Sequence, residues 1–244
     1  MAPTLYQEFA APARLKPYVE CFWSTEPRGA LPEYPVLPDG CVDIVYSPGM
    51  SRELQLVGTM THARRFALSA SQPQFGVRFR PGMSQAFLPL SGLETTDQSI
   101  ALSAIWGAEA GRLSEQISEA RSAVQGMALL EESLSNPGDI TLVQRVCASI
   151  VQQRGQIRMD DLASQAGLSA RQLRRIFLEH VGLSPKHFCR IIRFRDSLSR
   201  LPQAVRGDCA QVALECGYYD QAHFINEFRE FSGYTPGEFA SLER

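Results

Sequence analysis

Two stretches near the C-terminal end of the chain carry polar side chains at the spacing of one helix face. They are Arg171, Gln172, Arg174 and Arg175 in the first stretch, and Gln221, His223, Asn226 and Arg229 in the second. An arginine can bridge O6 and N7 of guanine, and a glutamine or asparagine can pair with N6 and N7 of adenine. These residue types therefore indicate hydrogen bonding to base edges in the major groove of a nucleic-acid duplex.

Both stretches belong to an internal repeat, in which residues 161–188 align with residues 211–239. The first two matches have an offset of 50 and the remaining six an offset of 51, because the second copy has one more residue in its turn. The matched pairs are Ala163 with Ala213, Gly167 with Gly217, Ser169 with Asp220, Leu173 with Phe224, Phe177 with Phe228, Gly182 with Gly233, Pro185 with Pro236 and Phe188 with Phe239. Since these residue types set turns, caps and helix contacts, two copies of one supersecondary unit are expected. The alternative is a helical bundle with a chance duplication.

Each copy is predicted to be a helix-turn-helix unit. A short helix with alanine on its inner face ends at Gly167 or Gly217, which can adopt positive φ. A capping Ser169 or Asp220 then begins a second helix, whose outer face carries the polar side chains. We expect the two units over residues 158–181 and 208–231, within an all-helical domain of residues 139–244.

The charge of the chain is divided unevenly. Residues 1–138 hold 10 Lys and Arg against 14 Asp and Glu, whereas residues 139–244 hold 14 against 12. Within residues 158–200 alone, nine basic side chains face four acidic ones. This local excess favours a polyanionic partner. The basic side chains expected to contact phosphates are Arg158, Lys186, Arg190, Arg193 and Arg195.

The C-terminal region resembles the DNA-binding domain of the AraC/XylS-type transcription regulators. The resemblance covers about residues 140–244 and rests on DDLASQAGLSARQLRRIF, on GLSP before an expected helix 185–200, and on ALECGYYDQAHFINEFREFSGYTPGEF. It implies two helix-turn-helix units joined by a long helix, with Ala222 among the residues that face the second groove. The capping Ser169 completes the predicted DNA contacts. Asn226 stands where the family often has Arg or Lys, and Glu227 adds an acid nearby, so weaker binding is expected from the second unit.

The first 135 residues have a different sequence pattern. Proline and glycine interrupt short runs rich in strand-forming residues at 41–46, 54–60, 65–70 and 75–80. From about residue 106 an apolar stripe at helical spacing follows, which packs either on the strands or on a second subunit, and Gly126 allows two consecutive helices there. The expected fold class is α+β with two domains, a small β-barrel or cupin-like domain over residues 1–135 and then the all-α double helix-turn-helix domain.

The resemblance also implies a role for the N-terminal domain. Many AraC-like regulators carry a cupin-like domain that senses a ligand or dimerises, and the segments 34–46, 57–66, 75–88 and 102–107 resemble an uncharacterised sensor-type domain. Each candidate for an effector pocket is more often a core or turn residue than a ligand contact. The candidates are Trp23, Asp39, Asp43, Tyr46, Phe66, Arg78 and Arg80.

Catalysis is not expected from this chain. A cupin metal centre usually needs two or three histidines with a carboxylate, and His62 is the only histidine before residue 180. No GxSxG, P-loop or dinucleotide-binding pattern occurs. We therefore expect no catalytic residue, no metal and no cofactor. The six cysteines lie far apart without a CxxC, which favours reduced thiols, and Cys21 with Cys41 could sense oxidants only if they meet in space.

Together these patterns predict a sequence-specific DNA-binding transcription regulator controlled by a small-molecule effector. Its expected partners are double-stranded DNA, an unidentified effector and, for an activator, RNA polymerase, while homodimerisation is left open. Apolar runs fall short of the ~18–20 residues that cross a bilayer, and no secretory signal is recognised, so a cytoplasmic location without a membrane partner is expected. The alternative is a ligand-binding or enzymatic β-barrel whose helical tail mediates assembly, but an assembly surface should expose Leu, Ile or Phe where the arginines stand.

Overall fold

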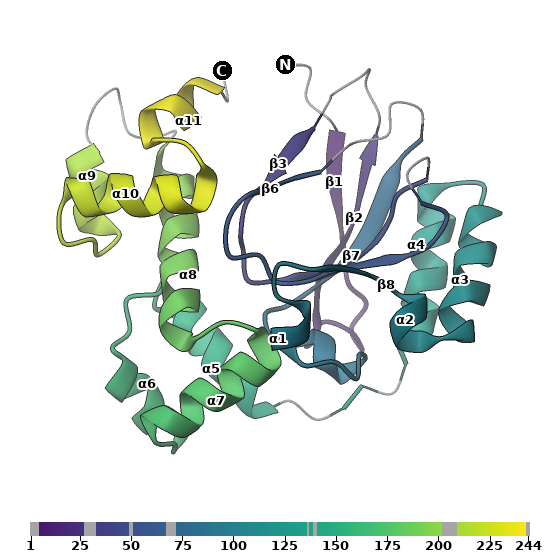
Figure 1. Ribbon diagram of the computed structural model, residues 1–244, viewed down its shortest axis with the longest axis horizontal. Helices are drawn as coiled ribbons and strands as arrows, with labels where there is room; N and C mark the ends of the chain where they lie inside the picture. The colour runs from purple at the N-terminus through teal and green to yellow at the C-terminus, as the bar shows by residue number, and fades with distance from the viewer. Residues whose placement is uncertain are drawn as a thin grey trace.

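The computed structural model describes residues 5–26, 33–48, 51–66, 72–135, 137–138, 141–201 and 209–242. Strands predominate up to residue 79, short helices and one more strand lead to two longer helices, the second of which ends at residue 133, and only helices follow from residue 141 onward in the described part of the chain (Figure 1). The predicted fold class is confirmed, with a β-rich N-terminal domain and a helical C-terminal domain. We keep residues 1–135 and 139–244 as the proposed limits of the two domains.

The N-terminal domain is built on a six-stranded antiparallel sheet. Its strands, in spatial order, are β1 (Leu5–Ala10), β2 (Val19–Glu26), β7 (Gln74–Phe79), β4 (Val42–Tyr46), β5 (Gln55–Val57) and β8 (Ser99–Ala101). A separate two-stranded sheet pairs β3 (Tyr34–Val36) with β6 (Arg64–Phe66). Within the described ranges no ladder joins β1 to β8, so the large sheet is open rather than a closed barrel.

One face of the large sheet is covered by helices. Alternate residues of β7 and β4, including Phe75, Val77 and Ile44, enter a core with α3 (Ala108–Ser118) and α4 (Ala123–Ser133). The two segments approach so closely that a Cβ added to Gly126 would lie 2.2 Å from Cζ of Phe75. The apolar stripe of residues 106–135 therefore packs on its own sheet, although Val124 stays 62% exposed.

The break between α3 and α4 lies at residues 119–122 rather than at Gly126. Ser122 begins α4 because its Oγ accepts the Gln125 N–H at 3.2 Å, which satisfies one of the unpaired donors of the first turn. Gly126 sits inside α4, where its missing side chain is needed for the contact with the sheet.

The C-terminal domain consists of seven helices in the described part of the chain. They are α5 (Thr141–Gln152), α6 (Met159–Ala166), α7 (Ala170–Val181), α8 (Pro185–Arg200), α9 (Cys209–Glu215), α10 (Gln221–Ser232) and α11 (Pro236–Leu242). Helix α8 connects the α6–α7 pair to the α9–α10 pair (Figure 1). Its aromatic side chain Phe194 lies 5.1 Å from Phe228 of α10, ring centre to ring centre, in a common buried core.

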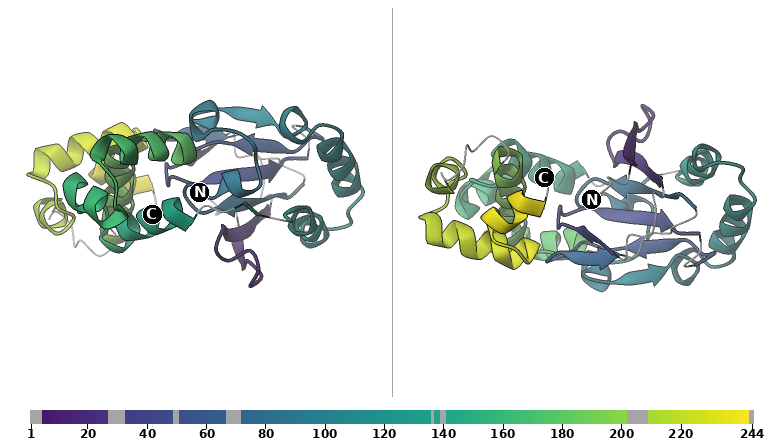
Figure 2. Two further views of the ribbon diagram at one scale, coloured as in Figure 1. Left: turned by 90° about the horizontal axis from the view of Figure 1, so that it is seen from below. Right: turned by 90° about the horizontal axis from the view of Figure 1, so that it is seen from above.

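The two domains are packed side by side (Figure 2), and the N-terminal domain contacts the C-terminal ends of both α7 and α10. Thr96, which follows the short helix α1 (Gly92–Thr95), donates its hydroxyl to the Gly182 carbonyl at 3.0 Å. The Ala63 N–H donates to the Phe231 carbonyl at 2.8 Å. Carbonyls that a helix leaves unpaired at its end are thus satisfied by the other domain.

None of the helices in the described ranges has the length and apolar character needed to cross a membrane.

Candidate nucleic-acid interface

The first helix-turn-helix unit consists of α6 and α7. Gly167 ends α6 with φ +67°, and Ser169 caps α7. The Ser169 Oγ accepts the Gln172 N–H at 3.3 Å, while Gln172 Oε1 accepts the Ser169 N–H at 3.0 Å. This reciprocal pair stabilises the start of α7, so the side chain of Gln172 has a capping role that the sequence reading missed.

The arginines of α7 lie on the outer side of that unit. Arg171, Arg174 and Arg175 are all exposed, and across the described residues none has an ion pair or a side-chain hydrogen bond. Leu173 and Phe177, on the opposite side, are buried in the domain core. The first turns of α7 therefore present three uncommitted guanidinium groups to solvent.

The second unit, α9 and α10, repeats this construction. Gly217 has φ +73°, and Asp220 caps α10 by accepting the His223 N–H at 2.7 Å. Helices α7 and α10 are both 12 residues long and end at glycines with φ +80°. The predicted contacts of this unit are all exposed: Gln221, Ala222, His223, Asn226 and Arg229.

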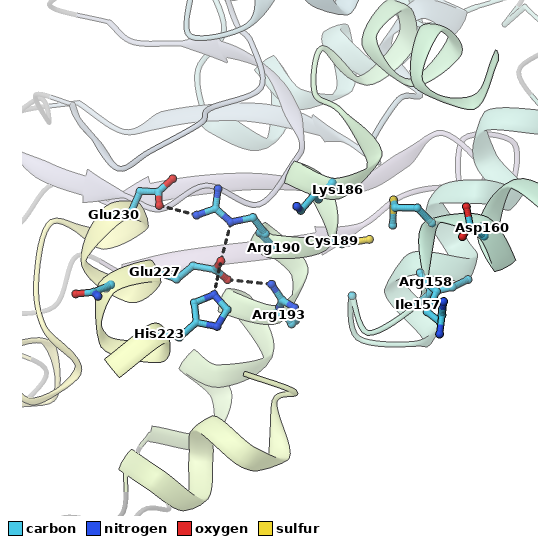
Figure 3. Close-up of a pocket in the computed structure, with 13 residues that line it drawn as sticks. Ile157, Arg158, Asp160, Lys186, Cys189, Arg190, Arg193, His223, Glu227 and Glu230 are labelled. Atoms are coloured by element: carbon cyan, nitrogen blue, oxygen red, sulfur yellow. Dashed lines mark hydrogen bonds and ion pairs between the residues drawn. The ribbon is translucent and has the colours of Figure 1, made fainter. Parts of the chain in front are cut away.

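A groove of about 810 Å³ runs between the two units, beside α8 (Figure 3). Arg158 and Lys186 line it and, among the described residues, have no ion pair. Arg195 is exposed on α8 but does not line the groove. A phosphate in the groove would meet Arg158 and Lys186 as uncommitted cations, whereas the other two predicted phosphate contacts have partners.

Those two, Arg190 and Arg193 of α8, are paired with Glu227 of α10. Arg190 Nε lies 2.6 Å from one carboxylate oxygen of Glu227, and Arg193 Nη2 lies 3.4 Å from the other. Glu227 is 3% exposed, so it does not lie on the outer face of α10. Its charge is neutralised against α8, and this removes the reason for expecting it to weaken the second unit.

The seven candidates for an effector pocket separate into two groups. Asp43 and Arg78 are paired across β4 and β7, with Arg78 Nε 3.2 Å from Asp43 Oδ1 and 3.5 Å from Asp39 Oδ2. Burial raises the pKa of Asp43 to about 6, although Arg78 acts in the opposite direction. Trp23 lies on the same face of the sheet, because Cys21, two residues before it on β2, is opposite Arg78. The structure thus brings four candidates together on the face away from α3 and α4.

The other three candidates lie elsewhere. Tyr46 is buried in the core on the helix-covered face, 5.3 Å from Phe75 between ring centres. Phe66 belongs to the small sheet, where the Arg64 guanidinium lies 5.3 Å from its ring centre. Arg80 is paired with Glu20 and donates to the Lys16 carbonyl at 3.0 Å.

The cysteines of this domain are held as thiols. Burial raises the pKa of Cys21 to about 12 and raises the pKa of Cys41 well above its usual value. Because the thiolate is the reactive form, neither side chain is activated towards oxidants at neutral pH. In the ranges that the structure describes, no three His, Cys, Asp or Glu side chains are grouped in a way that could hold a metal ion.

Comparison with known proteins finds a matching family for each of the two parts of the chain. Residues 162–241 match the model of a family described as a helix-turn-helix domain, which spans α7, α8 and α10. This C-terminal region is an AraC-type helix-turn-helix domain. Residues 7–101, which precede the AraC-type domain, match a domain of unknown function, DUF6597. The resemblance drawn from the sequence is therefore confirmed for both regions.

Relatives of the AraC-type domain are named as transcription regulators. An uncharacterised HTH-type transcriptional regulator of Haemophilus influenzae is 29% identical over 119 residues, which cover 49% of this chain and 40% of the relative. The HTH-type transcriptional regulator ArgR of Pseudomonas aeruginosa is 31% identical over 85 residues, or 35% of this chain and 26% of the relative. The match thus spans less than half the length of these relatives.

A solved structure of a probable AraC family transcriptional regulator from Rhodopseudomonas palustris is 26% identical. The alignment covers 42% of this chain and 97% of that chain, with a TM-score of 0.39.

Proposed function

We propose that this chain is a sequence-specific DNA-binding transcription regulator. The observation that carries the proposal is the pair of equally built second helices, α7 and α10, whose capped first turns expose cationic and amide side chains while one helix, α8, joins them. Two such helices suit successive turns of the major groove, which lie ~34 Å apart on one side of a duplex. Arg171, Arg174 and Arg175 would read one groove, and Gln221, His223 and Asn226 the next.

Regulation by a small molecule forms the second part of the proposal. The half-buried group of Asp39, Asp43 and Arg78, with Trp23 beside it, is the favoured place for an effector, because charged groups largely withdrawn from solvent are uncommon without a structural or binding role. RNA polymerase would be a further partner if the chain is an activator. One relative has that name: the HTH-type transcriptional activator RhaS of Pectobacterium atrosepticum is 28% identical over 81 residues.

The rival function, a β-barrel with a helical assembly tail, is less well supported. An assembly surface is expected to be apolar in its centre. The outer positions of α7 are instead three exposed arginines without partners in the described part of the chain.

Binding of the full chain to the DNA upstream of its own gene tests the proposal. Fluorescence anisotropy at two salt concentrations should show tighter binding to this DNA than to a scrambled duplex of equal length. Affinity for both duplexes should fall steeply with salt, because each neutralised phosphate releases counterions. Failure to bind either duplex at the lower salt concentration would contradict the proposal.

A further inference from the structure

Glu227 is a buried carboxylate on the flank of α10 that faces α8. Its side chain is only 3% exposed, whereas its neighbours on the same helix, Asn226 and Glu230, are exposed, although all three residues line the groove. In Figure 3 dashed lines join the carboxylate to Arg190 and Arg193 of α8 and to His223 on α10 itself. Glu227 is therefore placed to act on the helix rather than on a bound duplex.

Besides His223 of α10, whose Nε2 lies 3.7 Å from its Oε2, Glu227 has two partners on consecutive turns of α8. Arg190 and Arg193 are three residues apart and so share one side of that helix. Each guanidinium bonds a different oxygen of the same carboxylate, at 2.6 and 3.4 Å. Arg193 also lies 5.2 Å from the ring centre of Tyr218, in the turn before α10. The group thus joins α8 to both the turn and the middle of the second unit.

Directional hydrogen bonds restrict the rotation of α10 against α8 more tightly than the apolar core does. The rings of Phe194 and Phe228 hold α10 against α8, but ring contacts allow one helix to rotate slightly against the other. Charge-assisted hydrogen bonds to both oxygens of a carboxylate require a narrow set of orientations. Buried ion pairs of this kind contribute little net stability, and a role in specifying geometry is the better explanation for one.

A small rotation of α10 matters at the tips of its side chains. With side chains included, a helix has a radius of about 5–6 Å, so a rotation of about 10° moves a tip by about 1 Å. That displacement exceeds the ~0.5 Å tolerance of a productive polar contact. We propose that Glu227, held by Arg190 and Arg193, is a positioning residue that fixes the rotation of α10 and thereby the base preference of the second unit; this rests on the proposed DNA-binding function.

The test is the base preference of the full chain, obtained by selecting binding sites from a pool of random duplexes. The wild-type chain should select a two-part site, one part for each unit. Glu227→Gln should reduce the preference for the best bases in the α10 part by about tenfold, the loss expected when one good base contact is misplaced. The α7 part should be unchanged, which also shows that the variant is folded.

Glu230→Gln is the matched control. It makes the same chemical change one turn further along α10, at a residue that is 52% exposed and bonded to Arg190 without contacting Arg193 in the described structure. Both parts of the site should survive this change.

A second variant separates positioning from stability. Replacing Glu227, Arg190 and Arg193 together by methionine leaves no unpaired buried charge and keeps the space filled, so the fold should be retained by circular dichroism. The α10 part should again lose its base preference. Unchanged preference in the α10 part of either variant, or equal loss in both parts, would overturn the positioning role while the DNA-binding function stands. A wild-type chain that selects no site would overturn both.

Discussion

Replacing Gly182 by alanine should destabilise the folded chain by about 3 kcal/mol, whereas the same change at Gly233 should cost only about 1 kcal/mol. The two glycines hold matching places in the repeat, and both end their helix at φ +80°, so the strain of an L-residue is common to both. A Cβ at Gly233 meets no atom within 4 Å. At Gly182 it would lie 2.2 Å from Thr96 Oγ1 and 2.5 Å from the Gly92 carbonyl oxygen, and a backbone atom cannot move without displacing α1.

Urea unfolding of the full chain measures both changes, with Gly233→Ala as the control for backbone strain. The difference between the two variants isolates the contact between α7 and the N-terminal domain. Equal losses of unfolding free energy would show that α1 separates from α7 without cost. The contact between α1 and α7 would then contribute nothing to the stability of the chain.

Arg175→Ala should weaken binding to the selected duplex by about 1–3 kcal/mol and relax the base preference at one position of the α7 part. The reason is that Arg175 is exposed on α7 with no ion pair in the described residues, so its full hydrogen-bonding capacity is available to a base. Anisotropy titrations against the best site and against its single-base variants measure both effects.

Arg112→Ala is the control, because it removes the same charge from an exposed position on α3, at the end of the molecule opposite the C-terminal domain (Figure 1). It should leave the affinity nearly unchanged. If Arg175→Ala lowers the affinity for every sequence by the same factor, Arg175 contacts phosphate and does not read a base.

The helical domain was predictable because local signals and packing agree there. Gly167, Ser169 and Gly182 mark the ends of helices by backbone conformation and capping, which depend on neighbours in sequence. The family resemblance implies the linking helix over residues 185–200, and these are the observed limits of α8, Pro185–Arg200. Because the repeat contains each of the turn and cap positions twice, the second copy supports the helix limits predicted from the first.

Features that depend on distant residues were not predictable. β2 shows no clean alternation, because Cys21, Phe22, Trp23 and Ser24 are all buried although successive side chains of a strand point to opposite faces of the sheet. Burial of Glu227 depends on two arginines more than 30 residues away in sequence. The sequence pattern placed Glu227 near the reading surface, and only the packing of α10 on α8 shows that its charge is neutralised.

The contacts of the N-terminal domain with the ends of α7 and α10 bear on how freely such domains recombine. The Thr96 hydroxyl donates to the Gly182 carbonyl of the first unit, and the Ala63 N–H donates to the Phe231 carbonyl of the second. A chimera that joined this AraC-type domain to an unrelated partner would leave those helix ends to water and would lose a bridge across both units. Exchange of this C-terminal domain among relatives should therefore succeed best when the new N-terminal domain also has Gly92 and the segment around Ala63. The two domains are thus adapted to each other and are not freely interchangeable.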